Sequence, residues 1–305
     1  MKIIGALVVA TSLVVPVTQS LQNDKGWRPA WALDRIDQRE STLNDKYTYT
    51  YDGSGVTVYV MDSGINAGHE DFSGRVIGGF SAINDGRGTS DCAGHGTHTA
   101  GVIGGKTYGV AKNVTIVPVR VLDCKLGGSA TSVMAAAKWV IENHQAGVPA
   151  VVNISFSGSK SIPLNETVRS LIADGLIVVV AAGNQNRDAC SYSPSSETSA
   201  IVVGSIKQSG SKDSVSNTGP CVDLFAPGSD VVGAWFDAPK SYRSSSGTSN
   251  AAPVVAGIVA TMLQQNPLAT QADIERALLA NATRDVLTGL GAGSPNLLAY
   301  SVIGN

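Results

Sequence analysis

The stretch Val56–Gly64, "VTVYVMDSG", points to the fold class of this chain. Its first residues are β-branched or aromatic on both faces of an extended chain, which is typical of a strand in the centre of a parallel sheet. The run ends in Asp62, and Ser63 with Gly64 then turns the chain. Because α/β proteins bind ligands beyond the carboxyl ends of such strands, Asp62 is a candidate site residue. The alternative is an aspartate that only caps the turn.

Runs of the same kind recur along the chain, with helical patterns between them. The spacing of apolar residues predicts helices over Thr131–Ala146, ended by Gly147, and over Leu164–Asp174. Alternation of strands and helices predicts a single α/β domain, with a mostly parallel central sheet and helices on both faces. The other predicted strands are Thr115–Val121, Ala150–Ser155, Leu176–Ala182 and Ala200–Ser205.

The composition is that of a globular protein with a large core. Hydrophobic residues make up 43% of the 305 residues and charged residues 15%, which argues against a disordered chain. The net charge of −2 and the pI near 6.1 argue against electrostatic binding of nucleic acid. We expect no nucleic-acid partner, and we expect a monomer.

The N-terminal segment is typical of a secretory signal peptide. Lys2 supplies the positive start, "IIGALVVATSLVVPV" supplies the apolar stretch, and "TQS" ends in a small residue suited to cleavage near Ser20. A membrane anchor is the alternative, but Pro16 and the short run favour a signal over residues 1–20. The sequence therefore predicts a secreted, extracellular protein that is free of the membrane after cleavage.

Export would place the cysteines in an oxidising compartment, where an even set is read as disulfides. Three pairings of the four cysteines are possible. We favour the pairing that joins neighbours in the sequence, Cys92 with Cys124 and Cys190 with Cys221.

A second segment with candidate catalytic residues is Asp91–Gly105, "DCAGHGTHTAGVIGG". Glycines flank His95, and His98 follows one helical turn later. Ordinary helix histidines are one alternative. A zinc site with Asp62 and His69 is another, although the segment lacks the HExxH pattern with its catalytic glutamate.

A third segment is Ser246–Gly257, "SGTSNAAPVVAG". Pro253 falls in the expected first turn of a helix, where its missing N–H costs little. Ser249 either caps this helix or acts as a nucleophile in the positive potential of the helix N-terminus. Asn184 ends the buried run "VVVAAGN", where its carboxamide is placed to donate to an oxyanion. The order Asp62, His95, Ser249 along the chain is that of subtilisin-type enzymes.

Taken together, these segments resemble the subtilisin-like serine proteases, and within them the proteinase K and aqualysin branch. The resemblance covers roughly Trp31 to Tyr300. The matching motifs are "DSG" at Asp62, "GHGTHTAG" at Gly94–Gly101, "VPVRVLD" at Val117–Asp123, "AAGN" at Ala181–Asn184, "SYSPSSE" at Ser191–Glu197, "DLFAPG" at Asp223–Gly228 and "SGTSNAAPVVAG".

The resemblance implies a serine endopeptidase that works through an acyl-enzyme. It implies that Ser249 Oγ attacks the peptide carbonyl, that His95 is the general base and that Asp62 orients the imidazole. It further implies that Asn184 and the backbone N–H of Ser249 form the oxyanion hole.

The resemblance also implies a groove for polypeptide substrates. The substrate would lie as an added strand between Leu126–Gly128 and Ser155–Ser157. Its primary pocket would lie between Ser155–Gly158 and Ala181–Gly183, with broad specificity that leans to apolar or aromatic residues. The residues implied are Leu126, Gly127, Gly128, Ser155, Phe156, Ser157, Gly158, Ala181, Ala182 and Gly183.

Structural calcium is a further implication of the resemblance, and no catalytic metal is expected. Asp223 matches a ligand of one calcium site, with the backbone carbonyls of Thr198 and Ala200 as its partners. A second oxygen-rich cluster near the N-terminus suits Ca²⁺ better than a transition metal. The alternative is a solvated acidic turn. The residues of this cluster are Asp34, Asp37, Gln38 and Asn44.

Four features depart from the family pattern. Asn250 stands where the family has Met, Val254 stands where it has His, and "SFSG" at Ser155–Gly158 replaces "SLGG". The fourth is the short spacer before Trp31, which leaves no evident inhibitory prodomain, so we expect residues 21–305 to form the peptidase domain. A catalytically silent protein that binds extended peptides in an intact groove is the rival interpretation.

Overall fold

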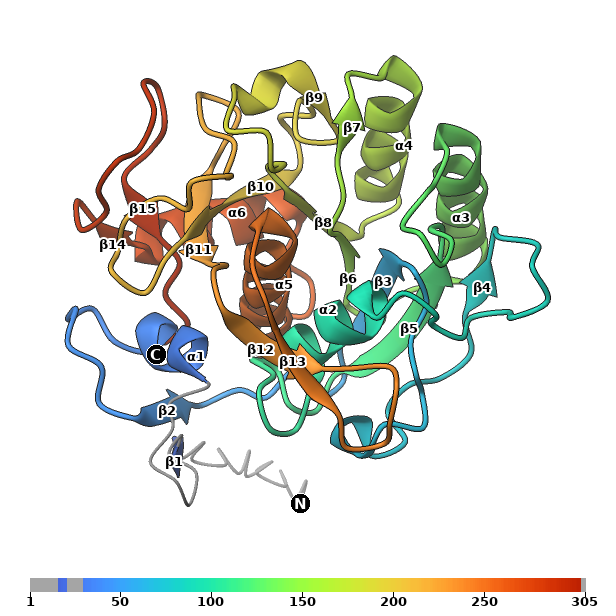
Figure 1. Cartoon of the computed structure of the whole chain (residues 1–305), viewed down its shortest axis with the longest axis horizontal. Helices are drawn as coiled ribbons and strands as arrows, with labels where there is room; N and C mark the ends of the chain where they lie inside the picture. Colours follow the sequence, from blue (N-terminus) through green and yellow to red (C-terminus); the bar gives the residue numbers. More distant parts are fainter. Residues whose placement is uncertain (1–15, 21–29, 303–305) are drawn as a thin grey trace, which may run out of the picture.

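A nine-stranded, mostly parallel sheet forms the centre of the molecule (Figure 1). The computed structural model describes residues 16–20 and 30–302. The sheet order is β14-β15-β11-β10-β8-β6-β3-β5-β4, and only the β14–β15 pair is antiparallel. Its strands are β3 (Thr57–Asp62), β4 (Phe80–Ser81), β5 (Thr115–Arg120), β6 (Ala150–Ile154), β8 (Ile177–Ala181), β10 (Ile201–Ile206), β11 (Leu224–Pro227), β14 (Thr283–Arg284) and β15 (Leu297–Leu298).

Helices cover both faces of the sheet, as predicted. α1, α2, α5 and α6 share one apolar core with one face of the strands, and α3 and α4 share a second core with the other face. Within β3, Val58 and Val60 point into the first core, whereas Tyr59 and Met61 point into the second. This alternation explains why the strand is apolar on both faces. The helices are α1 (Trp31–Ile36), α2 (His95–Gly104), α3 (Ala130–Asn143), α4 (Ile162–Ala173), α5 (Thr248–Gln265) and α6 (Gln271–Asn281).

Short pairs of strands complete the fold outside the large sheet. The hairpin of β12 (Val231–Ala234) and β13 (Tyr242–Ser245) packs against α2 and leads into α5. β7 (Gly158–Ser159) pairs with β9 (Tyr192–Ser193).

The predicted strands of the central sheet are confirmed to within two residues at each end, but two helix details were wrong. α3 ends at Asn143, three residues before the predicted end, because His144 is already extended and Gly147 lies in a later turn with φ of +83°. Pro253 is the sixth residue of α5 rather than part of its first turn. Because proline has no N–H, the Ser249 carbonyl four residues earlier lacks its α-helical donor.

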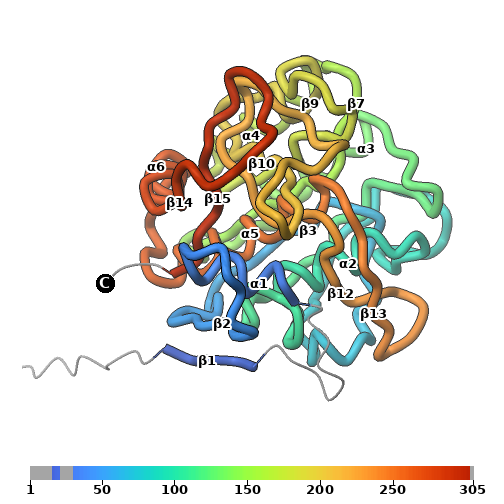
Figure 2. The backbone as a smooth tube through the Cα atoms, turned by 60° about the vertical axis from the view of Figure 1, so that its left-hand side comes forward, coloured from blue at the N-terminus to red at the C-terminus, as the bar shows by residue number. Residues whose placement is uncertain are grey.

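Part of the predicted signal peptide lies within the fold. Residues 1–15 are outside the described residues, but Val17–Ser20 form β1 and pair antiparallel with β2, Lys46–Tyr49 (Figure 2). Cleavage after Ser20 would therefore separate β1 from β2. Over residues 16–20 and 30–302, none of the helices combines the length and the apolar character that a bilayer crossing requires.

Candidate active site

Asp62 and His95 form a hydrogen-bonded pair at the carboxyl end of β3. His95 Nδ1 lies 2.8 and 2.9 Å from the two carboxylate oxygens of Asp62. Asp62 is fully buried, and its Oδ1 also accepts a hydrogen bond from the Ser63 N–H at 2.7 Å. With the Nδ1 proton donated to Asp62, the neutral ring keeps Nε2 as its proton acceptor. The pair is thus arranged for general base catalysis.

The surroundings of His95 raise its pKa above the ordinary value. Burial by itself lowers this pKa, but the charge of Asp62 and its hydrogen bond outweigh burial, and the charge of Asp91 adds to them. One helical turn later, burial lowers the pKa of His98 to about 4. Of these two histidines, only His95 can take up a proton near neutral pH.

Ser249 is the second residue of α5, at the N-terminus of the longest helix described. Gly247, the residue before the helix, has a φ of +137°, which suits glycine. The N–H groups of the first turn, including that of Ser249, have no acceptor within the helix. This helix end therefore offers a hydroxyl group and a backbone donor side by side, in the positive potential of the helix.

The packing of α2 against α5 brings His95 and Ser249 to the same end of the helix pair. Gly257, eight residues after Ser249, lies against the Ile103 carbonyl, eight residues after His95. Near the start of α2, His98 Nε2 is 3.1 Å from backbone carbonyls on both strands of the β12–β13 hairpin, which leads into α5. Both helices therefore begin on the same side of the molecule.

No hydrogen bond joins His95 to Ser249 within the described ranges. Contacts between a nucleophile and its base are commonly long in the absence of substrate and shorten when substrate binds. The geometry therefore brings the three residues into one region, with Asp62 and His95 already paired.

Asn184 reaches the same helix end from the loop after β8. Its Oδ1 accepts hydrogen bonds from the N–H and the hydroxyl of Thr248, both at 2.9 Å. Because a backbone N–H can only donate, the atom that faces it is the amide oxygen, and the Nδ2 group lies on the other side. In the part of the chain that the structure describes, Nδ2 donates to no protein atom. Asn184 Nδ2 and the Ser249 N–H are thus two donors that lie at the same helix end.

The segments predicted to flank a substrate strand line one hollow of about 300 Å³. Leu126 and Gly128 lie on one side, and Phe156, Ser157 and Gly158 lie on the other. Leu126 is 46% exposed with a φ of +62°, a strained conformation for leucine. The hollow is suited to an apolar side chain. Its other lining residues are Leu122, Ser129, Ala130, Val133, Ser159, Ser161 and Leu164.

Five of the ten predicted groove residues do not line this hollow. The side chains of Ser155, Ala181 and Ala182 are buried, because these residues end the central strands β6 and β8 or directly follow them. Any part that they play in a pocket would come from their backbone atoms. Gly127 does not line the hollow, and its N–H donates to Asp123 Oδ1 at 2.8 Å.

The two walls predicted for the primary pocket meet at Ser157 and Gly183. Gly183 has a φ of +99°, and Ser157 Oγ lies 2.8 Å from the position that a Cβ on Gly183 would occupy. Ser157 stands where the family pattern has glycine. Its hydroxymethyl group therefore takes up space between the two walls.

Both disulfides of the favoured pairing are present. Cys92 is bonded to Cys124 with a Cα–Cα distance of 5.0 Å, and Cys190 is bonded to Cys221 with a distance of 5.3 Å. The first bridge links the loop before His95 to the loop that carries the groove wall. It therefore ties one part of the site to the other.

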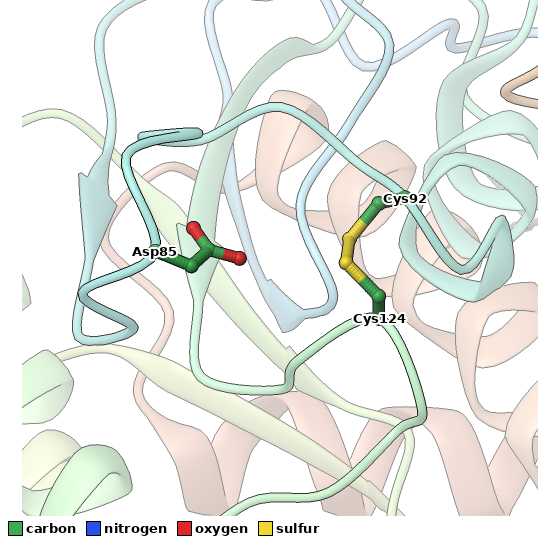
Figure 3. A group of neighbouring side chains, drawn as sticks. All are labelled: Asp85, Cys92 and Cys124. Atoms are coloured by element: carbon green, nitrogen blue, oxygen red, sulfur yellow. A yellow bond between two sulfur atoms is a disulfide. The ribbon is translucent and has the colours of Figure 1, made fainter.

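Beside this bridge lies a group with three potential metal ligands, Asp85, Cys92 and Cys124 (Figure 3). The two sulfur atoms are bonded to each other, so neither is a thiolate. The Asp85 carboxylate forms a two-pronged ion pair with the guanidinium of buried Arg120, with both contacts at 2.7 Å. The group is therefore a structural ion pair beside a disulfide, and it does not fit a metal ion.

The zinc alternative is not supported by the geometry. His98 Nε2 contacts backbone carbonyls, and His69 Nε2 lies 2.8 Å from the Ser241 carbonyl. Among the residues described, no group of three potential ligands includes a histidine.

The predicted N-terminal calcium ligands do lie together. Asp34 Oδ1 accepts a hydrogen bond from the Asn44 N–H at 3.0 Å, and Asn44 Nδ2 donates to Gln38 Oε1 at 2.7 Å. Asp37 Oδ2 accepts from the Thr48 N–H, but Asp37 Oδ1 is buried without a hydrogen-bond donor. Burial raises the pKa of Asp37 to about 6, and the charge of Asp34 adds to this effect. Buried Asp34 and half-buried Asp37 thus place two carboxylates close together, and one oxygen of Asp37 has no donor, which fits a calcium ion.

Asp223 is a second carboxylate whose charge burial disfavours. Its Oδ2 accepts a hydrogen bond from the Val202 N–H at 2.7 Å, which partly offsets burial, yet the pKa is raised to about 7. Ala200 lies two residues before Val202 and is buried, whereas Thr198 is exposed. This carboxylate also fits a cation.

Sequence reasoning missed the residues that hold the loop before His95. Asp91 accepts hydrogen bonds from the backbone of this loop, and Ser63 Oγ donates to Asp91 Oδ1 at 2.9 Å. The available signal was an aspartate four residues before the histidine, in a loop rich in glycine.

Comparisons with known proteins agree with this geometry. Residues 53–297 match the subtilase family, Peptidase S8. The chain is 50% identical over 271 residues to an extracellular serine proteinase of Thermus sp. (strain Rt41A), covering 89% of this chain and 66% of that relative. It is 44% identical to alkaline serine exoprotease A of Vibrio alginolyticus, covering 89% of this chain and 50% of the relative. The chain thus spans only part of both relatives.

A solved structure shows the same fold. The crystal structure of a cold-adapted subtilisin-like serine proteinase superposes with a TM-score of 0.86 at 45% identity, covering 89% of this chain and 97% of that one. The family match extends over most of the chain and includes the segments that carry Asp62, His95 and Ser249. We conclude that the chain belongs to the subtilase family of serine peptidases.

Proposed function

We propose that this chain is a secreted serine endopeptidase that cleaves polypeptides as a monomer, with residues 21–305 as its peptidase domain. The observation that carries the proposal is the Asp62–His95 pair, which lies at the same end of the α2–α5 helix pair as Ser249. The extracellular serine proteinase among its relatives supports the same reaction. The signal over residues 1–20 stays a prediction.

In the acylation step, Ser249 Oγ bonds to the carbonyl carbon of the scissile peptide. His95 Nε2 takes the hydroxyl proton, and the Asp62 carboxylate stabilises the resulting imidazolium through Nδ1–H. The carbonyl π electrons move to the oxygen, where Asn184 Nδ2–H and the Ser249 N–H can donate to the new oxyanion. The C–N bond then breaks, and His95 gives its proton to the leaving amine.

Deacylation repeats these steps with water as the nucleophile. His95 removes a proton from water, the water oxygen bonds to the acyl carbon, and the bond to Ser249 Oγ breaks with return of the proton to Oγ. The net reaction adds one water molecule across one peptide bond. The same two donors hold the oxyanion in both halves.

A fluorophosphonate probe together with a peptide library tests this function. An active peptidase is expected to be labelled at Ser249 and to cleave internal bonds of the library. The rival interpretation, a silent protein that binds extended peptides, predicts binding of library peptides with neither labelling nor cleavage. Either result decides between the two.

We propose that the groove accepts a broad range of apolar residues, with Ser157 limiting their size in the primary pocket. Ser157→Gly is expected to raise kcat/KM for a phenylalanine substrate about 10-fold relative to an alanine substrate, because the hydroxymethyl group no longer fills the space beside Gly183. Steady-state kinetics on matched peptides measure the ratio. The control is Ser159→Gly, because Ser159 lines the hollow but does not face Gly183. An unchanged ratio in Ser157→Gly would contradict the assignment.

We propose structural calcium at the N-terminal cluster and at Asp223. Asp34, Asp37, Gln38 and Asn44 would supply side-chain oxygens to one ion, and Asp223 would supply a carboxylate to the other. A bound cation would stabilise the charged form of Asp37 and of Asp223, whose pKa values are raised, and so stabilise the fold.

Removal of calcium by EGTA at pH 8 is expected to lower Tm by about 5–10 °C, the size that about 2.7 kcal/mol of binding free energy gives in a domain of this length. Without calcium, the raised pKa of Asp37 means that stability is present near pH 4 and is lost as the pH rises through about 6. The stabilisation that added calcium gives to calcium-free protein should therefore shrink near pH 4. Calorimetry with Asp37→Asn and with exposed Asp237→Asn as its control measures this, and a pH-independent effect would contradict it.

A further inference from the structure

A second carboxylate, Asp91, organises the loop that carries His95. Asp91 Oδ1 accepts hydrogen bonds from the N–H groups of Ala93 and Gly94, each at 2.9 Å. Asp91 Oδ2 accepts from the N–H of Thr97 at 2.9 Å and from its hydroxyl at 2.6 Å. A single side chain thus holds residues on both sides of His95.

Helix α2 depends on this carboxylate for the role that a capping side chain usually fills. Its N-cap residue is Gly94, with a φ of +92° and no side chain, and its first turn contains no acidic residue. The N–H groups of a first helical turn need acceptors, and negative charge is favourable there. Asp91 supplies both from three residues before the cap. The position of His95, the first residue of α2, is therefore tied to Asp91.

Asp91 is also linked to Asp62 through one residue. Ser63 Oγ donates to Asp91 Oδ1 at 2.9 Å and accepts from the Gly96 N–H at 2.9 Å. The backbone N–H of Ser63 donates to Asp62 Oδ1. The strand that bears Asp62 and the helix that bears His95 are thus joined by a continuous hydrogen-bond network through the second carboxylate.

We propose that Asp91 is a positioning residue for peptide hydrolysis: it holds the His95 loop against β3 and keeps a second negative charge near the imidazole. The proposal rests on the proposed peptidase function. Asp91 makes no hydrogen bond to the His95 ring among the described residues, so it acts through the backbone and through its charge.

The charge of Asp91 has a definite consequence for the reaction. The charged groups that act on His95 are Asp62 from β3 and Asp91 from its own loop. His98, one turn later on α2, does not contribute, and burial lowers its own pKa to about 4. Both carboxylates favour the imidazolium that forms when Ser249 loses its proton. Removal of the Asp91 charge should lower the pKa of His95. The acid limb of the kcat/KM profile reports the pKa of the general base in the free enzyme. This limb should then move to lower pH.

The test compares Asp91→Asn with Asp71→Asn in the full chain. Asp71 is a matched control because it is 3% exposed and its carboxylate accepts from the N–H and hydroxyl of Thr107, yet it makes no contribution to the pKa of His95. For Asp91→Asn we expect kcat to fall about 10-fold and the acid limb to move down by about half a pH unit. For Asp71→Asn we expect a lower Tm with the acid limb in place. Asp91→Glu should restore the limb.

The proposal is overturned if the Tm of Asp91→Asn falls but the acid limb of its kcat/KM profile coincides with that of the wild type. Asp91 would then have a purely structural role. If Asp91→Asn does not fold, Ser63→Ala decides, because it breaks the bridge to the Gly96 N–H but keeps both charges. We then expect a several-fold lower kcat with an unchanged limb, and an unchanged kcat would overturn the positioning role. Failure of wild-type protein to react with a fluorophosphonate would instead refute the peptidase function.

Discussion

Replacing Ser249 by alanine is expected to abolish measurable peptide hydrolysis while the protein keeps its fold. Without Oγ there is no atom to form the acyl-enzyme, and His95 has no hydroxyl proton to take. The expected loss is the one measured for the catalytic serine of a subtilisin, about 10⁶-fold in kcat. Ser249 is only partly buried, so loss of its hydroxyl removes little packing. Cleavage of a chromogenic peptide, followed in excess enzyme, measures the loss.

The matched control is Ser244→Ala, on the exposed β13 strand that leads into α5. It should keep wild-type kcat and fluorophosphonate labelling. Peptide binding by Ser249→Ala should persist, because the groove and Asn184 are unchanged. Hydrolysis by purified Ser249→Ala within 100-fold of the wild-type rate would contradict the serine mechanism.

Replacing Asp62 by asparagine is expected to lower kcat by about 10⁴-fold, the size seen for the corresponding aspartate in serine proteases. The asparagine amide would donate to His95 Nδ1, which places the ring proton on Nε2, where it cannot accept the Ser249 proton. KM should change little, because Asp62 is fully buried behind His95, to which it is hydrogen-bonded. Steady-state kinetics give kcat and KM separately.

Asp71→Asn serves again as the control for the loss of a buried carboxylate, and it should keep kcat. Circular dichroism and Tm show whether Asp62→Asn keeps its fold. If KM changes while kcat is preserved, Asp62 acts in binding or packing rather than in orienting His95.

The central sheet could be predicted from the sequence because its strands are apolar on both faces. Val56–Gly64 carries the pattern of a doubly buried strand, and β3 indeed lies between β5 and β6. The ends of the helices were harder to predict from the sequence. The sequence predicts a helix over Thr131–Ala146 that is ended by Gly147, but α3 stops at Asn143, because His144 is already extended.

Sequence reasoning could also single out the candidate reacting residues, because Asp62, His95 and Ser249 each lie beside glycines at a strand or helix end. The residues that line the groove could be predicted from the sequence only in part. Ala181 and Ala182 fall in the right segment, but β8 buries their side chains in the cores. Which atoms of a segment face a groove depends on the layers packed above and below it.

The sequence by itself determined the α/β class, the order of the three candidate catalytic residues and the cysteines available for pairing, because these depend on local periodicity and on residue type. Only the tertiary structure decided that Asp91 connects Asp62 to the start of α2, that Ser157 faces Gly183, and that Asp37 and Asp223 are half-buried. These contacts join residues that lie up to tens of positions apart. They exist because two layers of helices pack on one sheet and bring the loops at its carboxyl edge together.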